Sequence, residues 1–149
     1  PGRLTLPLAH GVGPEGKVVA LDLQPGMLAR AKSRTEAAGL TNVEFIAAPL
    51  GEGKLPAGHF DRALLVTVLG EIPDRTAAMT ELFSSLKAGG ILAIVEVIFD
   101  PHFQSRKTVT ELATSTGFLE RTFFGHTLAY VIHFEKPADQ LASERGNTP

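Results

Sequence analysis

Short runs of apolar residues alternate along this chain with segments in which apolar residues recur every three or four positions. The first pattern is typical of buried β-strands and the second of amphipathic helices. The expected strands cover residues 17–23, 43–47, 62–69 and 91–99. The expected helices cover residues 2–10, 25–38, 74–86 and 104–116. This alternation predicts a mainly parallel sheet with helices on both faces, in which the run 62–69, apolar on both faces, takes a central place.

Local signals mark the ends of several of these elements. Asp74 is a suitable N-cap for the third helix, and Gly89-Gly90 and Gly117 are expected to end the third and fourth helices. Near the C-terminus, two β-rich runs flank Gly125-His126-Thr127, and so short a connection requires an antiparallel hairpin. The hairpin therefore inserts one antiparallel strand near an edge of the otherwise parallel sheet.

Composition limits the classes of protein that the chain can represent. Its 149 residues, 44% of them apolar, suit one domain, expected over 1–137, with a polar flexible tail over 138–149. The net charge of -2 gives no support to nucleic acid or a membrane as partner. No apolar stretch is long enough to cross a bilayer, and the lack of cysteine excludes thiolate chemistry. We also expect no secretory leader. We expect a cytoplasmic protein.

The carboxylate of Asp22 is a candidate ligand-binding group. The apolar run Val-Val-Ala-Leu ends in Asp22, and Pro25-Gly26 then opens a helix. An acid at the carboxyl end of a buried parallel strand points into the crevice of an open α/β sheet, where it can bind both hydroxyls of a ribose. A nucleoside-containing cofactor is therefore predicted, with Leu23 and Gln24 beside its ribose and adenine. The other interpretation of Asp22 is an ordinary acid that caps the next helix.

Four segments resemble the class I S-adenosylmethionine-dependent methyltransferases, in particular those that act on small molecules. They are the strand that ends at Asp22, the stretch 60–74 that opens with Phe-Asp and closes with Pro-Asp, the turn Leu-Lys-Ala-Gly-Gly over 86–90, and the terminal hairpin. The resemblance implies a Rossmann-like fold, S-adenosylmethionine as cofactor, and methyl transfer to a small organic acceptor.

The chain also departs from the family's pattern. Gly2 matches the end of the family's glycine-rich turn, and the strand before that turn, which is central in the family's sheet, is missing from the chain. Because unpaired buried backbone is costly, we predict that upstream residues exist, that another chain supplies the strand, as in a homodimer, or that the sheet is rearranged. Leu50 occupies a position near the adenine, to which it offers its backbone N–H.

Several residues after the later strands are candidates for the acceptor side. Thr67 lies where the resemblance places the crevice, and Glu71 and His102 follow the third and fourth strands. Either Glu71 or His102 is a candidate to take a proton from the acceptor, although exposed loop residues often have no such role. No pair of histidines has metal-ligand spacing, so no metal is predicted.

Two other functions stay open at this point. An acid after the second strand also occurs in nicotinamide-dependent oxidoreductases, although the terminal hairpin favours the methyltransferase. The chain can also be a truncated or degenerate methyltransferase-like module that binds a partner without activity.

Overall fold

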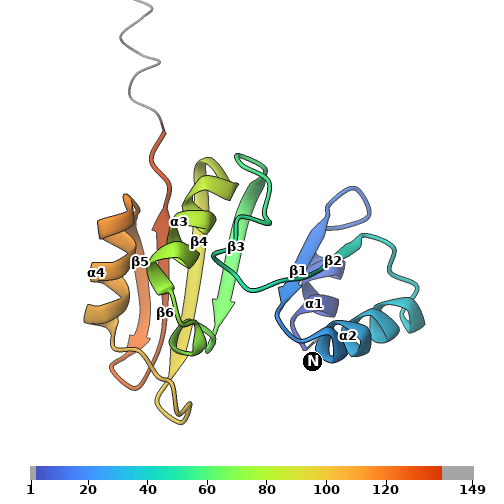
Figure 1. Ribbon diagram of the computed structural model, residues 1–149, viewed down its shortest axis with the longest axis horizontal. Helices are drawn as coiled ribbons and strands as arrows, with labels where there is room; N and C mark the ends of the chain where they lie inside the picture. Colours follow the sequence, from blue (N-terminus) through green and yellow to red (C-terminus); the bar gives the residue numbers. More distant parts are fainter. Residues whose placement is uncertain (1–2, 139–149) are drawn as a thin grey trace, which may run out of the picture. The chain divides into compact units, whose positions relative to one another are not determined.

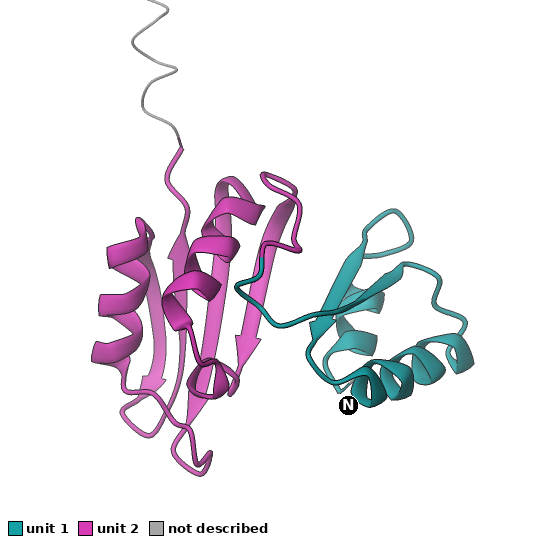
Figure 2. Cartoon of the chain, in the orientation of Figure 1, with its two compact units in different colours: residues 1–52 teal, residues 53–149 magenta. Residues whose placement is uncertain are grey.

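The computed structural model describes residues 3–138, and the chain folds into two compact units, residues 1–52 and 53–149 (Figures 1 and 2). Each unit combines helices with its own small sheet, so the predicted α/β class is correct. The single domain expected over 1–137 stays a prediction. The predicted tail lies outside the described residues from position 139 onward.

Unit 1 (residues 1–52) contains two strands that pair in parallel. Its elements are α1 (Thr5–Gly11), β1 (Val18–Asp22), α2 (Pro25–Ala37) and β2 (Val43–Ala47). The register runs from Val18 opposite Val43 to Asp22 opposite Ala47, so both strands end at the same edge. Pro7 lies in the first turn of α1, where the missing N–H of proline costs nothing.

The core of unit 1 is small. Among its described residues, the buried apolar ones are Ala9, Leu28, Ala31 and Ala48. The side chain of Asn42 adds a polar tie, because its Nδ2 donates to the carbonyls of Ala9 at 2.9 Å and Gly13 at 3.0 Å. Since Leu28 is the one large apolar side chain that is buried in the described part of this unit, the unit gains little from the hydrophobic effect.

Unit 2 (residues 53–149) contains a four-stranded sheet in the order β3-β4-β6-β5. Only β3 and β4 are parallel, whereas β6 pairs with β4 and β5 in antiparallel orientation. The predicted terminal hairpin is thus confirmed. The elements of the unit are β3 (Phe60–Val66), the 3-10 helix η1 (Leu69–Glu71), α3 (Arg75–Ser85), β4 (Leu86–Val97), α4 (Arg106–Thr116), β5 (Leu119–His126) and β6 (Ala129–Glu135).

Both helices of unit 2 begin at a side-chain cap. The carboxylate of Asp74 accepts from the N–H of Ala77 at 2.8 Å, as predicted, and the hydroxyl of Ser105 accepts from the N–H of Thr108 at 3.2 Å. Gly117 ends α4 with a φ of 110°, a left-handed conformation that favours glycine. The bounds predicted for these two helices, 74–86 and 104–116, lie within two residues of those observed, because such signals act locally.

The core of unit 2 is continuous and large. Helices α3 and α4 contact each other and pack on the sheet, and the ring of Phe118 lies edge-on to Phe83 at 5.0 Å between centroids. The largest fully buried apolar side chains are Leu69, Met79, Leu86, Leu92, Ile94, Val109, Phe118, Ile132 and Phe134. Burial of this many large side chains makes unit 2 the more stable part of the chain.

Some boundaries predicted from the pattern are wrong. Strand β3 covers 60–66 rather than 62–69, and Leu69 belongs to η1. Strand β4 begins at Leu86 without an intervening loop, because Phe60 pairs with Leu86, so Gly89-Gly90 lie inside the strand. Pairing with β3 therefore moves the start of β4 toward the N-terminus, and no local sequence pattern indicates this pairing.

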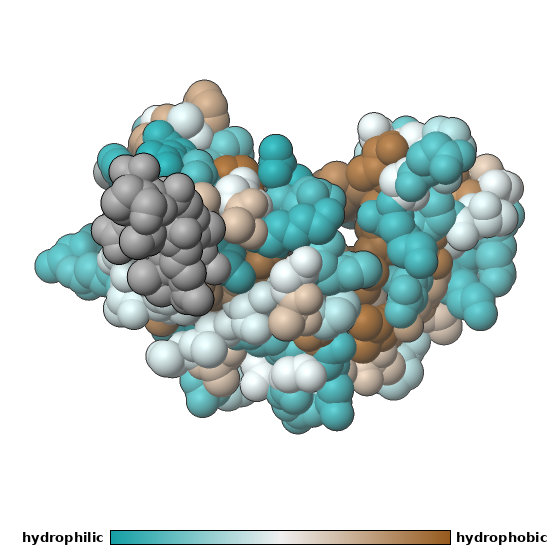
Figure 3. Space-filling view, turned by 90° about the horizontal axis from the view of Figure 1, so that it is seen from above, coloured by the Kyte–Doolittle hydropathy of each residue, from teal (hydrophilic) through white to brown (hydrophobic). Residues whose placement is uncertain are grey.

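Strand β3 does not take the central place in a sheet that was expected for the run 62–69. Among residues 3–138, β1 pairs with β2 alone and β3 pairs with β4 alone. Apolar surface is exposed on both units (Figure 3), and Leu64 on β3 is 40% exposed. Both strands therefore retain an unpaired edge in the described chain.

Candidate functional site

Asp22 is the last residue of β1 and lies half-buried at the carboxyl edge of the parallel pair. Its Oδ1 accepts from the N–H of Gln24 at 2.8 Å, a turn that acidic side chains form with the backbone two residues later. Its backbone carbonyl accepts from the N–H of Ala48 at 3.2 Å. The described residues place no donor on Oδ2, so this oxygen is available to a ligand.

The other cofactor candidates of unit 1 lie after the same two strands. Leu23 is 65% exposed and Gln24 is exposed, and both follow β1 directly. Leu50 follows β2 and is half-buried. Because β1 and β2 end side by side, the two segments share one edge of unit 1. Gly2 lies outside the described residues.

Thr67 follows β3 in unit 2 with an unusual backbone conformation. Its φ is 50°, which a β-branched residue rarely adopts and which stores strain. Its N–H donates to the carbonyl of Val95 at 2.9 Å, which ties the residue to the neighbouring parallel strand. The sequence carries no local signal for this strain, since threonine gives no hint of a positive φ.

The structure brings the two candidate proton acceptors together. His102 lies in the loop after β4 (residues 98–105, the 98–105 loop), and Glu71 lies in η1. The imidazole Nδ1 is 3.7 Å from Glu71 Oε1 and 3.9 Å from Asp100 Oδ1. The side chains of His102 and Glu71 are 54% and 56% exposed. An imidazole beside two carboxylates at the ends of parallel strands can accept a proton from a bound molecule.

A buried carboxylate near this pair was not singled out by sequence reasoning. Glu96 is only 1% exposed, and its Oε2 accepts from the N–H of Gln104 at 3.1 Å. Burial raises the pKa of the Glu96 carboxyl, Asp100 raises it further, and the Gln104 N–H and Arg75 act in the opposite direction. The alternation of β4 places Glu96 on the same face as two core residues, a signal that was present in the sequence.

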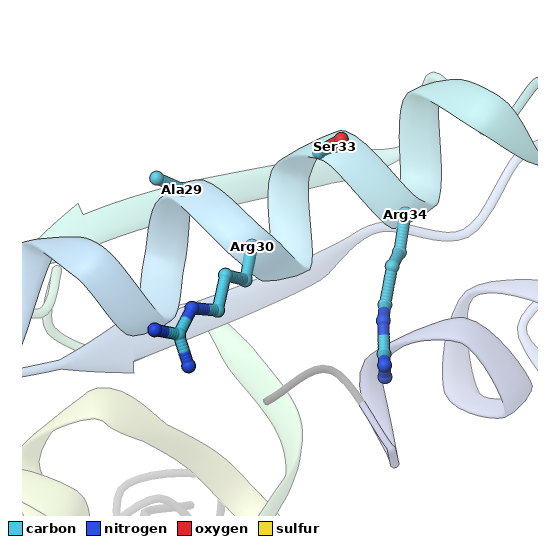
Figure 4. Close-up of a pocket in the computed structure, with 4 residues that line it drawn as sticks. All are labelled: Ala29, Arg30, Ser33 and Arg34. Carbon is cyan, nitrogen blue, oxygen red and sulfur yellow. The ribbon is translucent and has the colours of Figure 1, made fainter.

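The pocket on α2 is lined by residues other than these candidates. Its lining residues are Ala29, Arg30, Ser33 and Arg34 (Figure 4). Within residues 3–138, no three histidine or acidic residues are grouped as a metal site would require. In the same part of the chain, no helix has the length and apolar character needed to cross a membrane.

Comparison with known proteins identifies the family. Residues 1–90 match the family described as "Methyltransferase domain". The chain is 35% identical to a demethylmenaquinone methyltransferase of Geobacillus stearothermophilus over 92 aligned residues. The aligned region makes up 62% of this chain and 39% of that protein. It is 33% identical over 95 residues to the enzyme of the same name from Lactococcus lactis, covering 64% and 38%. The chain thus spans about two fifths of the length of these relatives.

Solved structures confirm the fold. A SAM-dependent methyltransferase from Aquifex aeolicus has a TM-score of 0.80 at 21% identity, over 88% of this chain and 74% of that one. The N-methyltransferase NodS from Bradyrhizobium japonicum, in complex with S-adenosyl-L-homocysteine, has a TM-score of 0.74 at 19% identity, over 91% and 73%. The [4+2]-cyclase SpnF has a TM-score of 0.79 at 15% identity, over 92% and 71%. At these identities the likeness shows the Rossmann-like fold alone, and the family match does not favour an oxidoreductase.

Proposed function

The chain belongs to the methyltransferase domain family, and from this premise we propose that it binds S-adenosylmethionine and transfers the methyl group to a small organic acceptor. The observation that carries the proposal is Asp22, whose carboxylate lies at the carboxyl edge of a parallel strand pair and, within residues 3–138, receives a donor on Oδ1 alone. A truncated module without activity is the alternative that the experiments below test.

The residues of unit 1 fit the nucleoside of this cofactor. The two ribose hydroxyls need acceptors, and a carboxylate held in place by the Gln24 amide supplies them. We propose that Leu23 and Gln24 lie beside the ribose and adenine, and that the Leu50 N–H contacts the adenine ring. We assign the methionine part of the cofactor to Gly2 by its resemblance to the family's turn.

Unit 2 supplies groups for the acceptor. The cofactor, when bound, provides a methyl carbon already activated by the positive sulfonium, so the protein chiefly needs to align the acceptor and remove its proton. We propose that His102 takes this proton and that Glu71, whose Oε1 lies 3.7 Å from the imidazole Nδ1, orients the ring. We propose that Thr67, which follows β3 in the same unit, also contacts the acceptor.

We further propose that the acceptor is a reduced quinone, on the basis of the names of the two relatives compared above. When bound, the cofactor would supply its methyl group to a ring carbon of the quinol and would leave as the neutral thioether, and that ring carbon would lose its proton to water. Transfer of a hydroxyl proton from the quinol to His102 would raise the nucleophilicity of the ring carbon. This transfer is the role that we propose for His102 as a base.

Calorimetric titration of the whole chain with S-adenosyl-L-homocysteine tests the proposal. We expect binding by the parental protein and about 100-fold weaker binding by Asp22→Ala, because two hydrogen bonds to a charged group contribute about 1.5 kcal/mol each. Glu44→Ala removes an exposed carboxylate from the neighbouring strand and serves as the matched control.

The outcomes separate the alternatives. Equal binding by Asp22→Ala and the parental protein would remove the role of Asp22, and binding of NAD in place of S-adenosyl-L-homocysteine would favour an oxidoreductase. No binding of either would favour the inactive module. The homodimer with a strand supplied in trans has no support in the described residues, and the cytoplasmic location stays a prediction.

A further inference from the structure

Glu96 is a charged residue at a position where the fold otherwise buries apolar side chains. On the covered face of β4 it follows Leu92 and Ile94, and all three are no more than 1% exposed. A carboxylate in such a place costs several kcal/mol unless hydrogen bonds or opposite charges compensate. Because Glu96 lowers stability at this position, we ask which neighbouring segment it holds in place.

The carboxylate is tied to one backbone amide of the 98–105 loop. Its Oε2 accepts from the N–H of Gln104 at 3.1 Å, and Oε1 has no partner. The charged groups that influence it are Asp100 from the same loop and Arg75 from the start of α3, and Arg75 Nε is also buried without a partner. The compensation of Glu96 therefore depends on the position of the loop.

Gln104 connects Glu96 to other residues of the loop and to β6 through hydrogen bonds. Its carbonyl accepts from the hydroxyl of Tyr130 at 2.6 Å. Its side-chain Nε2 donates to the carbonyls of His102 at 2.7 Å and Phe103 at 3.2 Å. Tyr130 stands opposite Glu96 in the β4–β6 register, so the two anchors of Gln104 come from paired positions of neighbouring strands.

The opposite side of the loop fits closely against η1. A Cβ atom on Gly70 would overlap the carbonyl oxygen of His102, so only glycine allows this approach. Arg75 donates to the carbonyl of Gly70 at 3.1 Å and holds η1 from the other direction. The separation of 3.7 Å between His102 and Glu71 results from these two fixed segments.

We propose that Glu96 is a positioning residue, which holds the 98–105 loop through Gln104 so that His102 stays beside Glu71. The proposal rests on the proposed methyl transfer for its chemical purpose, since it concerns the proton-accepting pair. Its geometric content is independent of the cofactor, because every group named belongs to unit 2. Glu96 itself does not contact the acceptor in this proposal.

Four variants of the whole chain separate positioning from stability. Glu96→Ala removes the acceptor for the Gln104 N–H, whereas Glu96→Gln retains an acceptor oxygen there. Leu92→Val weakens packing on the same strand and face, and it is the matched control, because the Leu92 side chain has no hydrogen-bonding group that could hold the loop. Tyr130→Phe removes the second anchor of Gln104 and replaces Glu96→Ala if that variant does not fold.

Two NMR measurements report the position of the loop. Hydrogen exchange of the Gln104 amide is expected to be at least about 10-fold faster in Glu96→Ala than in the parental protein, and close to parental in Glu96→Gln and Leu92→Val. Glu71→Gln is then added to each background. The His102 ring resonances are expected to respond to it in the parental protein and in Glu96→Gln, and not in Glu96→Ala.

The results decide the proposal in either direction. It is overturned if Glu96→Ala keeps both the slow exchange of Gln104 and the response of His102 to Glu71→Gln, or if Leu92→Val loses them equally. Binding of S-adenosyl-L-homocysteine is measured in parallel. If the parental chain does not bind it, the proposed function fails, while the NMR measurements still test the role of Glu96.

Discussion

Both units carry their candidate site residues at the carboxyl ends of parallel strands, but different contacts hold these residues in place. In unit 1 the Asp22 carboxylate is fixed by the amide of Gln24, two residues away. In unit 2 the approach of His102 to Glu71 depends on residues as distant in sequence as Gly70 and Tyr130. A site built from local contacts tolerates a small core, whereas one built from distant contacts needs a rigid one. The sizes of the two cores agree with this difference.

The first prediction concerns the cores themselves. Phe134→Ala, which truncates a fully buried ring that packs near Phe118, is expected to reduce the free energy of unfolding by about 3–5 kcal/mol. Leu28→Ala, in the thin core of unit 1, should cost about 2 kcal/mol, the lower end for such truncations. Urea unfolding measures both. A larger loss for Leu28→Ala would break the comparison.

The second prediction concerns local opening. Backbone amides of β1 and β2 are expected to exchange through openings that cost about 2 kcal/mol less than those that expose β4 and β6. The reason is that a two-stranded sheet with one large buried side chain is only marginally stable. Native-state hydrogen exchange of the whole chain gives these free energies. Equal values would show that the chain unfolds as one cooperative unit.

The third prediction compares helix starts. Asp74→Ala is expected to lower stability by about 1 kcal/mol, because it removes the acceptor for the Ala77 N–H at the start of α3. Gln24, the N-cap of α2, makes no side-chain capping bond, so Gln24→Ala should have no comparable effect. Thermal unfolding of the two variants checks the contrast. A similar loss for both would mean that α2 is capped in a different way.

The smallest expected effect is a pH dependence in unit 2. Arg121 lowers the pKa of Glu135 below its ordinary value of 4.5, chiefly through the hydrogen bond from Nε at 2.8 Å. Because the pKa of Glu135 is lower in the folded than in the unfolded chain, the ionised carboxylate stabilises the fold at pH values above 4.5. This stabilisation is lost as the pH falls through the lowered pKa. Glu135→Gln should therefore flatten the loss of stability in acid. Unfolding curves between pH 6 and pH 3 at matched ionic strength test this, and an unchanged acid slope would contradict it.

Much of the local structure could be predicted because its signals lie within a few residues. The run that ends at Asp22, the Asp74 cap and the Gly117 stop each report a structure that forms from neighbouring residues. The start of β4 at Leu86 was missed, because it depends on pairing with Phe60, which is distant in the chain. The positive φ of Thr67 was missed for the same kind of reason.

The candidate site divides in the same way. Sequence alone identified the carboxylate at the end of β1 and named Glu71 and His102 separately, each from its place after a strand. It did not indicate that these two side chains meet or that a buried Glu96 stands behind them. Their distance depends on how η1 and the 98–105 loop pack, which is a property of the folded chain.

By itself, then, the sequence determined the order of strands and helices, the hairpin and the position of Asp22, because apolar periodicity and turn residues act over short distances. Tertiary structure alone decided which strand edges are paired, where β4 begins, and how Glu96 and Gln104 bring His102 next to Glu71. The physical reason is that these contacts join residues far apart in the chain, and their energies exist only after the core of unit 2 has formed.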